Sequence, residues 1–373
     1  MDITKPYFLI MPALISLFSC HFFFYELSFF VVINSALILV LFAVVSSILM
    51  FSVGVDRLPE NSVSVALINS TNKFNRVFWI IIGASFASST LLVLYFSNKF
   101  GFYSIFVNAS LLQTNAISNS LGNFLYLNVF VFPVLFILTL YKSKLYFVLL
   151  FFSLFFLYFA GIKSYMFQSF ALLGLILLSG RKVGSLSFYS FLLLSALFLY
   201  FFIYDVLIDL ASENAGHSFD RFLSYFSGSW ATYSFYLKDG LETPYPGLTI
   251  FYPIYKLASM GQITLDEYYR FYEINGFQLN VVPLFQLAYL EGGFWLQLFM
   301  VFVLSFAYVF LRLLCFQYKR NVFFRVCLYF FCSTFIISSL FANVFQDLPV
   351  YISIFILIFA GFISQVRLKK RLR

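Results

Sequence analysis

The chain has 373 residues, of which 62% are hydrophobic and 10% charged, and its mean hydropathy is +0.94. Soluble domains carry about 25% charged residues, so this composition excludes a water-soluble globular protein. The formal net charge of +8 does not indicate a nucleic-acid partner, because no run of five basic residues occurs. The composition therefore predicts an integral membrane protein with several spans.

Ten apolar stretches approach or exceed the length of about 20 residues with which a helix crosses a bilayer. In chain order they lie near 6–24, 28–54, 77–97, 122–141, 145–162, 164–180, 186–208, 294–318, 322–341 and 349–366. We expect the first to be an uncleaved span, because no small-x-small cleavage site follows Lys5. The predicted fold is an all-α polytopic membrane protein that forms one domain, 1–373.

The basic residues predict the orientation of these spans, because cytoplasmic loops carry an excess of lysine and arginine. The C-terminal tail holds five of them, Arg367, Lys369, Lys370, Arg371 and Arg373. Counting back through alternating spans places both termini in the cytoplasm and two long segments outside, about 98–121 and 209–290. The second of these is the large loop between the seventh and eighth spans. At its end, Val281–Leu290 is either re-entrant or the slanted start of the eighth span.

The sequence lacks the motifs of soluble enzymes and the residue spacing of a metal site. It has two histidines, and its cysteines fall inside apolar stretches, so we expect neither a metal nor another cofactor. The span interiors hold few ionisable residues, which disfavours a proton-coupled transporter or a channel. Arg312 lies near the inner end of the eighth predicted span, where its side chain could extend to the interface.

Three cations on the predicted outer side are candidate phosphate ligands. Lys163 stands alone between the fifth and sixth spans, where it either contacts lipid headgroups or faces a phosphate group. Arg221 follows Asp220 and lies four residues after His217. It either pairs locally with Asp220 or binds a pyrophosphate bidentately, with His217 or Asp220 available as a base. Arg270 either pairs with the glutamate three residues later or binds phosphate.

Four segments on this side resemble the motifs of one enzyme family, in the same order. Residues 161–164 resemble a small-x-Arg/Lys-Ser hairpin, and 220–228 resemble an Arg-x-x-x-Tyr-x-x-Gly segment. Residues 246–255 resemble a Gly-x-x-Thr-x-x-Pro-Ile loop, and 280–293 resemble an Asn…Asp-x-Gly entry into the next span. Together they resemble Wzy-type O-antigen polymerases over about half of the chain. The chain has lysine at 163 where that family often has arginine, and glutamate at 291 where it often has aspartate.

This resemblance implies a membrane bundle similar to GT-C-like glycosyltransferases, in the bacterial inner membrane, with 209–290 as a periplasmic loop. The implied substrate is an undecaprenyl-pyrophosphate-linked oligosaccharide, and the implied reaction transfers the growing glycan to an incoming repeat unit. A chain-length regulator and a flippase of the same pathway would be partners, besides membrane lipid. Neither a metal nor a cofactor is implied.

The resemblance also implies three groups of site residues. The leaving pyrophosphate would be stabilised by fixed cations, Lys163, Arg221 and Arg270. The general base would come from His217, Asp220 or Glu291. Aromatic side chains would position the sugars, namely Tyr225, Trp230 and Tyr255, although most aromatic residues here are expected to lie in the membrane interface.

Other functions are compatible with the same features. An O-antigen ligase or another polytopic lipid-linked glycosyltransferase would share the loop and the cations but use a different acceptor. A lipid-linked oligosaccharide flippase would carry cations at mid-span and have short loops, which is the reverse of this pattern. A purely structural membrane protein would not need a long aromatic outer loop.

Overall fold

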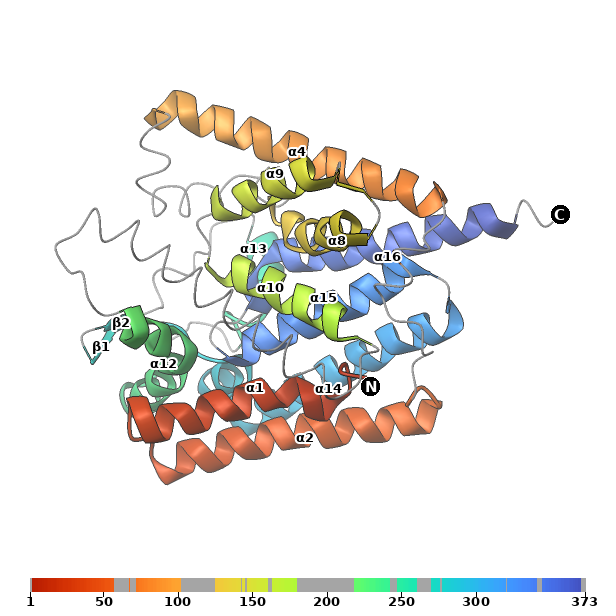
Figure 1. The fold of residues 1–373 in the computed structure, drawn as a ribbon. Coiled ribbons are helices and arrows are strands. Elements are labelled where there is room, and N and C mark those ends of the chain that lie inside the picture. The colour runs from red at the N-terminus through yellow and green to blue at the C-terminus, as the bar shows by residue number, and fades with distance from the viewer. Residues whose placement is uncertain are drawn as a thin grey trace.

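The computed structural model describes most of the helical bundle (Figure 1). The described residues are 2–56, 67, 72–101, 125–141, 143–144, 146–159, 163–179, 218–241, 247–259, 270–275, 277–319, 321–340 and 344–369. The seventh predicted span, 186–208, and the outer segment 98–121 beyond Gly101 lie outside these residues, as do parts of the large predicted loop.

Almost every described element is a helix. In the first part of the chain they are α1 (Pro6–Ser19), a π-helical turn η1 (Cys20–Phe24), α2 (Phe29–Val53), α4 (Asn72–Phe100), α8 (Asn128–Tyr141), α9 (Tyr146–Phe159) and α10 (Lys163–Leu178). The second part contains α12 (Ser218–Asp239), α13 (Tyr252–Ala258), α14 (Leu284–Gln317), α15 (Val322–Leu340), a 3₁₀ turn η2 (Val344–Gln346) and α16 (Leu348–Lys369). One antiparallel hairpin pairs β1 (Tyr272–Ile274) with β2 (Phe277–Leu279).

The all-α membrane architecture is confirmed. Six of the described helices are long and apolar enough to cross a membrane. They are Pro6–Phe24, Phe29–Val53, Arg76–Phe100, Leu284–Gln317, Val322–Leu340 and Leu348–Gln365. Three shorter apolar helices, Asn128–Tyr141, Tyr146–Leu157 and Tyr165–Leu178, fall on further predicted spans. The total of ten spans stays a prediction.

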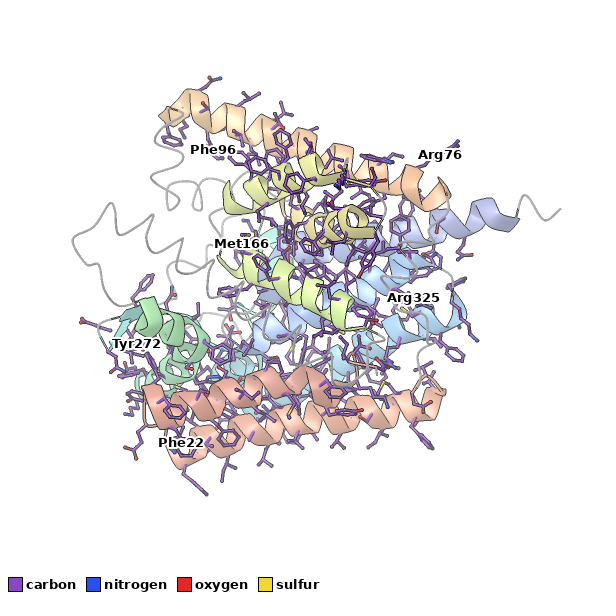
Figure 2. All side chains as sticks on the ribbon, in the orientation of Figure 1. Phe22, Arg76, Phe96, Met166, Tyr272 and Arg325 are labelled. Atoms are coloured by element: carbon purple, nitrogen blue, oxygen red, sulfur yellow. The ribbon has the colours of Figure 1, made fainter. Side chains whose placement is uncertain are left out.

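The bundle is built around α15. Every residue of this helix except Ile336 is buried, because α1, α10, α14 and α16 pack around it. In contrast, α2 and α14 present large apolar side chains outward, such as Phe29 at 82% exposure and Trp295 at 79%. Phe22, in the π-helical turn η1, is similarly exposed (Figure 2). Apolar surface of this extent suits contact with lipid and not with water.

The helix α14 begins ten residues before the predicted eighth span. The larger part of Val281–Leu290, from Leu284, forms the start of α14. The helix bends at Gly292 and Gly293, where the backbone leaves helical geometry. Gly293 has φ +66° and ψ −162°, a conformation open almost only to glycine. The glycines thus separate the first two turns of α14 from its membrane-spanning remainder.

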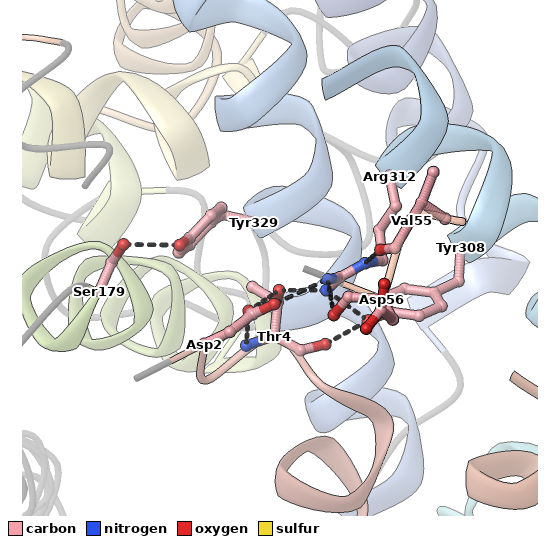
Figure 3. Close-up of polar contacts among 8 residues, drawn as sticks. All are labelled: Asp2, Thr4, Val55, Asp56, Ser179, Tyr308, Arg312 and Tyr329. Atoms are coloured by element: carbon pink, nitrogen blue, oxygen red, sulfur yellow. Dashed lines mark hydrogen bonds and ion pairs between the residues drawn. The ribbon is translucent and has the colours of Figure 1, made fainter. Parts of the chain in front are cut away.

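Arg312 is a buried structural residue of α14 (Figure 3). Its guanidinium donates to the Asp2 carboxylate at 2.7 Å and to the Thr4 hydroxyl at 2.9 Å. Further bonds join it to the Tyr308 hydroxyl and to the backbone carbonyls of Val55 and Asp56. The Arg312 side chain is itself buried, and its partners are the N-terminal residues and the residues that follow α2. The bonds attach the N-terminal residues and the end of α2 to α14.

The contact between α15 and α16 provides a test of this packing. A Cβ atom added to Gly361 of α16 would lie 2.5 Å from a ring carbon of Phe324 on α15. We expect Gly361→Ala to lower the free energy of unfolding by about 1–3 kcal/mol, because overpacking forces the helices apart. The measurement is the thermal midpoint of the purified protein in detergent.

Gly83→Ala is the matched control for that substitution. Gly83 also lies inside an apolar helix, α4, but an added Cβ there meets no atom within 4 Å. Alanine is the better helix former, so the control should be neutral or slightly stabilising. Equal destabilisation by both substitutions would contradict the packing explanation.

Candidate functional site at the α12 end of the bundle

The predicted outer segments that the structure describes gather at one end of the bundle, which we call the α12 end. In Figure 1, α12 and the β1–β2 hairpin lie there, on the opposite side from the marked C-terminus. Tyr272 marks this end in Figure 2, and Arg325 lies toward the other. The α12 end therefore contains two described parts of the segment 209–290, α12 and the β1–β2 hairpin.

The helix α12 is packed into the bundle. Ser229 donates a hydrogen bond to the carbonyl of Leu340, the last residue of α15, at 2.6 Å. Trp230 is fully buried, and its Nε1 donates to the Ser16 hydroxyl of α1 at 3.0 Å. Gly228 makes room for Leu279 of β2, because a Cβ atom there would collide with the leucine side chain. Part of the segment expected to be a loop is thus a helix, and it is held by contacts with α15, α1 and β2.

The burial of Trp230 corrects the expectation that its indole positions a sugar. An indole with no accessible surface has no face to offer to a ligand, and its N–H already has a partner. Tyr255 lies on α13 and is half-buried. The side chain of Tyr225 lies outside the described residues. The role expected for Tyr255 and Tyr225 stays a prediction.

Two of the predicted cations lie in the first turns of helices. Lys163 is the first residue of α10, and Arg221 follows Asp220 in the first turn of α12. A helix N-terminus favours an anion, since its backbone N–H groups are free and its dipole is positive there. The side chains of Lys163, Asp220 and Arg221 lie outside the described residues, and so does the whole of His217.

Glu291 is the last residue of α14 before the glycine bend. Its Oε1 accepts a hydrogen bond from the backbone N–H of Thr249 at 2.9 Å. The turn at residues 247–250 is buried against it and leads directly into α13. Glu291 therefore holds the segment that carries Tyr255.

Arg270 lies just before β1, with its side chain exposed. Its backbone is held by Tyr236 of α12: the hydroxyl accepts from the Arg270 N–H at 2.7 Å and donates to the Arg270 carbonyl at 3.0 Å. Burial raises the pKa of the Tyr236 hydroxyl, so it stays a neutral donor and acceptor at ordinary pH. The hairpin is fixed to α12 in this way.

The structure adds a residue that the sequence interpretation missed, Asp347. It lies between η2 and α16, and the hydroxyl of Tyr165, in the first turn of α10, hydrogen-bonds to its carboxylate. Tyr126 stands edge-on to Tyr165, with ring centroids 4.4 Å apart. A signal was present in the sequence, because Asp347 is a lone carboxylate in a short connection between two apolar stretches.

Among the residues that the structure describes, no group of three or more histidine, cysteine, aspartate or glutamate side chains could hold a metal ion. The chain was compared with protein-family models, curated proteins and solved structures, and none of them matches it.

Proposed function

We propose that this chain polymerises undecaprenyl-pyrophosphate-linked oligosaccharide repeat units on the outer face of the bacterial inner membrane. The growing glycan would leave its pyrophosphate carrier and join a hydroxyl of the incoming repeat unit. An apolar bundle suits the polyprenyl chain, and an exposed end suits the sugars. Both termini would be cytoplasmic, so that the α12 end faces the periplasm.

The observation that carries the proposal is the position of Lys163 and Arg221 in the first turns of α10 and α12. The departing pyrophosphate gains negative charge as the glycosidic bond to it breaks. Fixed cations at helix N-termini would stabilise that charge more strongly in the transition state than in the bound substrate. The order of the four motifs along residues 161–293 supports the proposed polymerase function. The position of Arg270 in the predicted outer loop supports it as well.

The experiment is deletion of the gene, followed by electrophoresis of the surface polysaccharide. We expect loss of the ladder of long chains and retention of the core capped by a single repeat unit, because assembly, export and attachment of one unit do not need a polymerase. Re-expression from a plasmid should restore the ladder.

The same gel separates the alternatives. Complete loss of capping would indicate a ligase, and loss of both capping and export would indicate a flippase. An unchanged ladder would contradict any role in this glycan transfer. A chain-length regulator of the pathway would shift the modal chain length without removing the ladder.

A further inference from the structure

The strongest unassigned feature is the side chain of Asp347, at the corner that joins α15 to α16. Its backbone N–H donates to the carbonyl of Val344 at 3.1 Å, and its carbonyl accepts from the N–H of Val350 at 3.1 Å. The corner is therefore fixed on both sides of Asp347. The residue as a whole is half-buried.

Tyr165 donates the hydrogen bond to this carboxylate, and it lies beside a network of buried polar side chains. The Tyr126 ring packs edge-on against Tyr165 at 79°, and the Tyr126 hydroxyl donates to Gln168 Oε1. The Gln168 Nε2 in turn donates to the Thr334 hydroxyl of α15 at 2.5 Å. Tyr126, Tyr165 and Gln168 are each at most 4% exposed. A satisfied buried network of this kind holds its members in one geometry.

Among the described residues, three phenols face Asp347 from neighbouring elements. Tyr165 comes from α10, Tyr126 from the turn before α8, and Tyr351 from the first turn of α16. Burial raises the pKa of the Asp347 carboxyl to about 7, and the hydrogen bond from Tyr165 acts in the opposite direction. A carboxyl with this pKa both accepts and releases protons near neutral pH.

Asp347 contacts α10 near its N-terminal end, where the helix begins with Lys163. The tyrosine that binds its carboxylate is two residues after Lys163, the cation proposed to face the pyrophosphate. Glycan transfer needs a base for the acceptor hydroxyl and a cation for the leaving group within one site. Lys163 and Tyr165 both belong to the first turn of α10.

We propose that Asp347 is the general base that accepts the proton of the acceptor hydroxyl, and that Tyr165 positions its carboxylate. The assignment rests on the proposed function. The acceptor oxygen bonds to the anomeric carbon while its proton passes to Asp347. The bond from the anomeric carbon to the pyrophosphate oxygen breaks, and the electron pair leaves with undecaprenyl pyrophosphate. Asp347 then returns the proton to water.

The first test is complementation of the deletion strain with Asp347→Asn. The amide has the size of a protonated carboxyl, so the protein should insert normally, and chain polymerisation should fall about a hundredfold or more. The matched control is Asp239→Asn at the end of α12, an exposed carboxylate that also interacts with a tyrosine, Tyr272. The control should give a normal ladder. A normal ladder from Asp347→Asn at equal membrane abundance overturns the assignment.

The second test is the pH profile of chain growth in spheroplasts suspended between about pH 6 and about pH 8. The wild type should lose activity below about pH 7, because the base is then protonated. Tyr165→Phe removes the hydrogen bond that lowers the pKa of Asp347, so the acidic limb should move to higher pH. A role in packing alone would lower activity without moving this limb, and an unmoved limb therefore overturns the assignment.

An infrared pH titration of the purified protein gives a readout that does not depend on activity. The C=O stretching band of a protonated carboxyl should appear as the pH falls through about 7 and be absent in Asp347→Asn. Absence of this band in the wild type overturns the assignment. Failure of the proposed function looks different, because then the deletion itself would leave the polysaccharide ladder unchanged.

Discussion

Replacing Arg312 by alanine is expected to destabilise the protein by about 3–5 kcal/mol, since removing one partner of a buried ion pair leaves the other without compensation. The Arg312 side chain has no exposed surface, and its Asp2 partner is 18% exposed. The substitution also removes hydrogen bonds to Thr4, Tyr308 and the carbonyl of Val55. The N-terminal residues and the residues that follow α2 would both lose these hydrogen bonds to α14.

The measurement is the thermal midpoint in detergent, together with the fraction that stays monodisperse after heating. Arg312→Lys is the informative second variant. A lysine retains the charge opposite Asp2 but cannot reproduce the planar fork of donors, so its loss of stability should be intermediate. An unchanged midpoint for Arg312→Ala would show that the attachment does not contribute to stability.

Replacing Arg221 by alanine is expected to abolish the ladder of long polysaccharide while the protein still inserts. Loss of one preorganised charge that stabilises a developing anion typically lowers the rate about a hundredfold to a thousandfold. The control is Lys238→Ala, which removes an exposed cation from the last turn of the same helix and should leave the ladder unchanged.

Lys163→Arg tests the second cation of the proposed site in the same assay. Polymerisation should persist if Lys163 only offers charge to a phosphate, because arginine offers the same charge. Loss of the ladder at unchanged expression would indicate a tighter geometric role for the lysine. A normal ladder from Arg221→Ala would contradict the assignment of the pyrophosphate site.

The membrane-spanning helices were predictable because their signal is local. A run of about 20 apolar residues crosses a bilayer whatever its neighbours are, and nine of the ten predicted stretches coincide with described helices. The packing of α12 was not predictable in the same way. Its sequence is mixed in polarity and fitted an interfacial segment, and only the contacts of Ser229 and Trp230 with α15 and α1 placed it inside the bundle.

The candidate site likewise has residues that the sequence predicts and contacts that it does not. Lys163, Arg221 and Arg270 stood out in the sequence because positive charge is unexpected on the side that the topology prediction places outside. Asp347 was visible in the sequence as a lone carboxylate between two apolar stretches. Its contact with Tyr165 was not predictable, because Tyr165 is far away in the chain and a tyrosine in an apolar span gives no sign of its partner. Glu291 was noticed, but its bond to the Thr249 N–H depends on a turn about forty residues earlier.

The sequence by itself determined that this is an all-α membrane protein, since composition and the lengths of apolar stretches suffice for that. The tertiary structure decided which polar groups meet inside it: Arg312 with Asp2, Trp230 with Ser16, and Tyr165 with Asp347. The physical reason is that the spans are apolar on all sides, so periodicity cannot tell the lipid-facing side from the buried one. The few polar residues find their partners only when the helices pack.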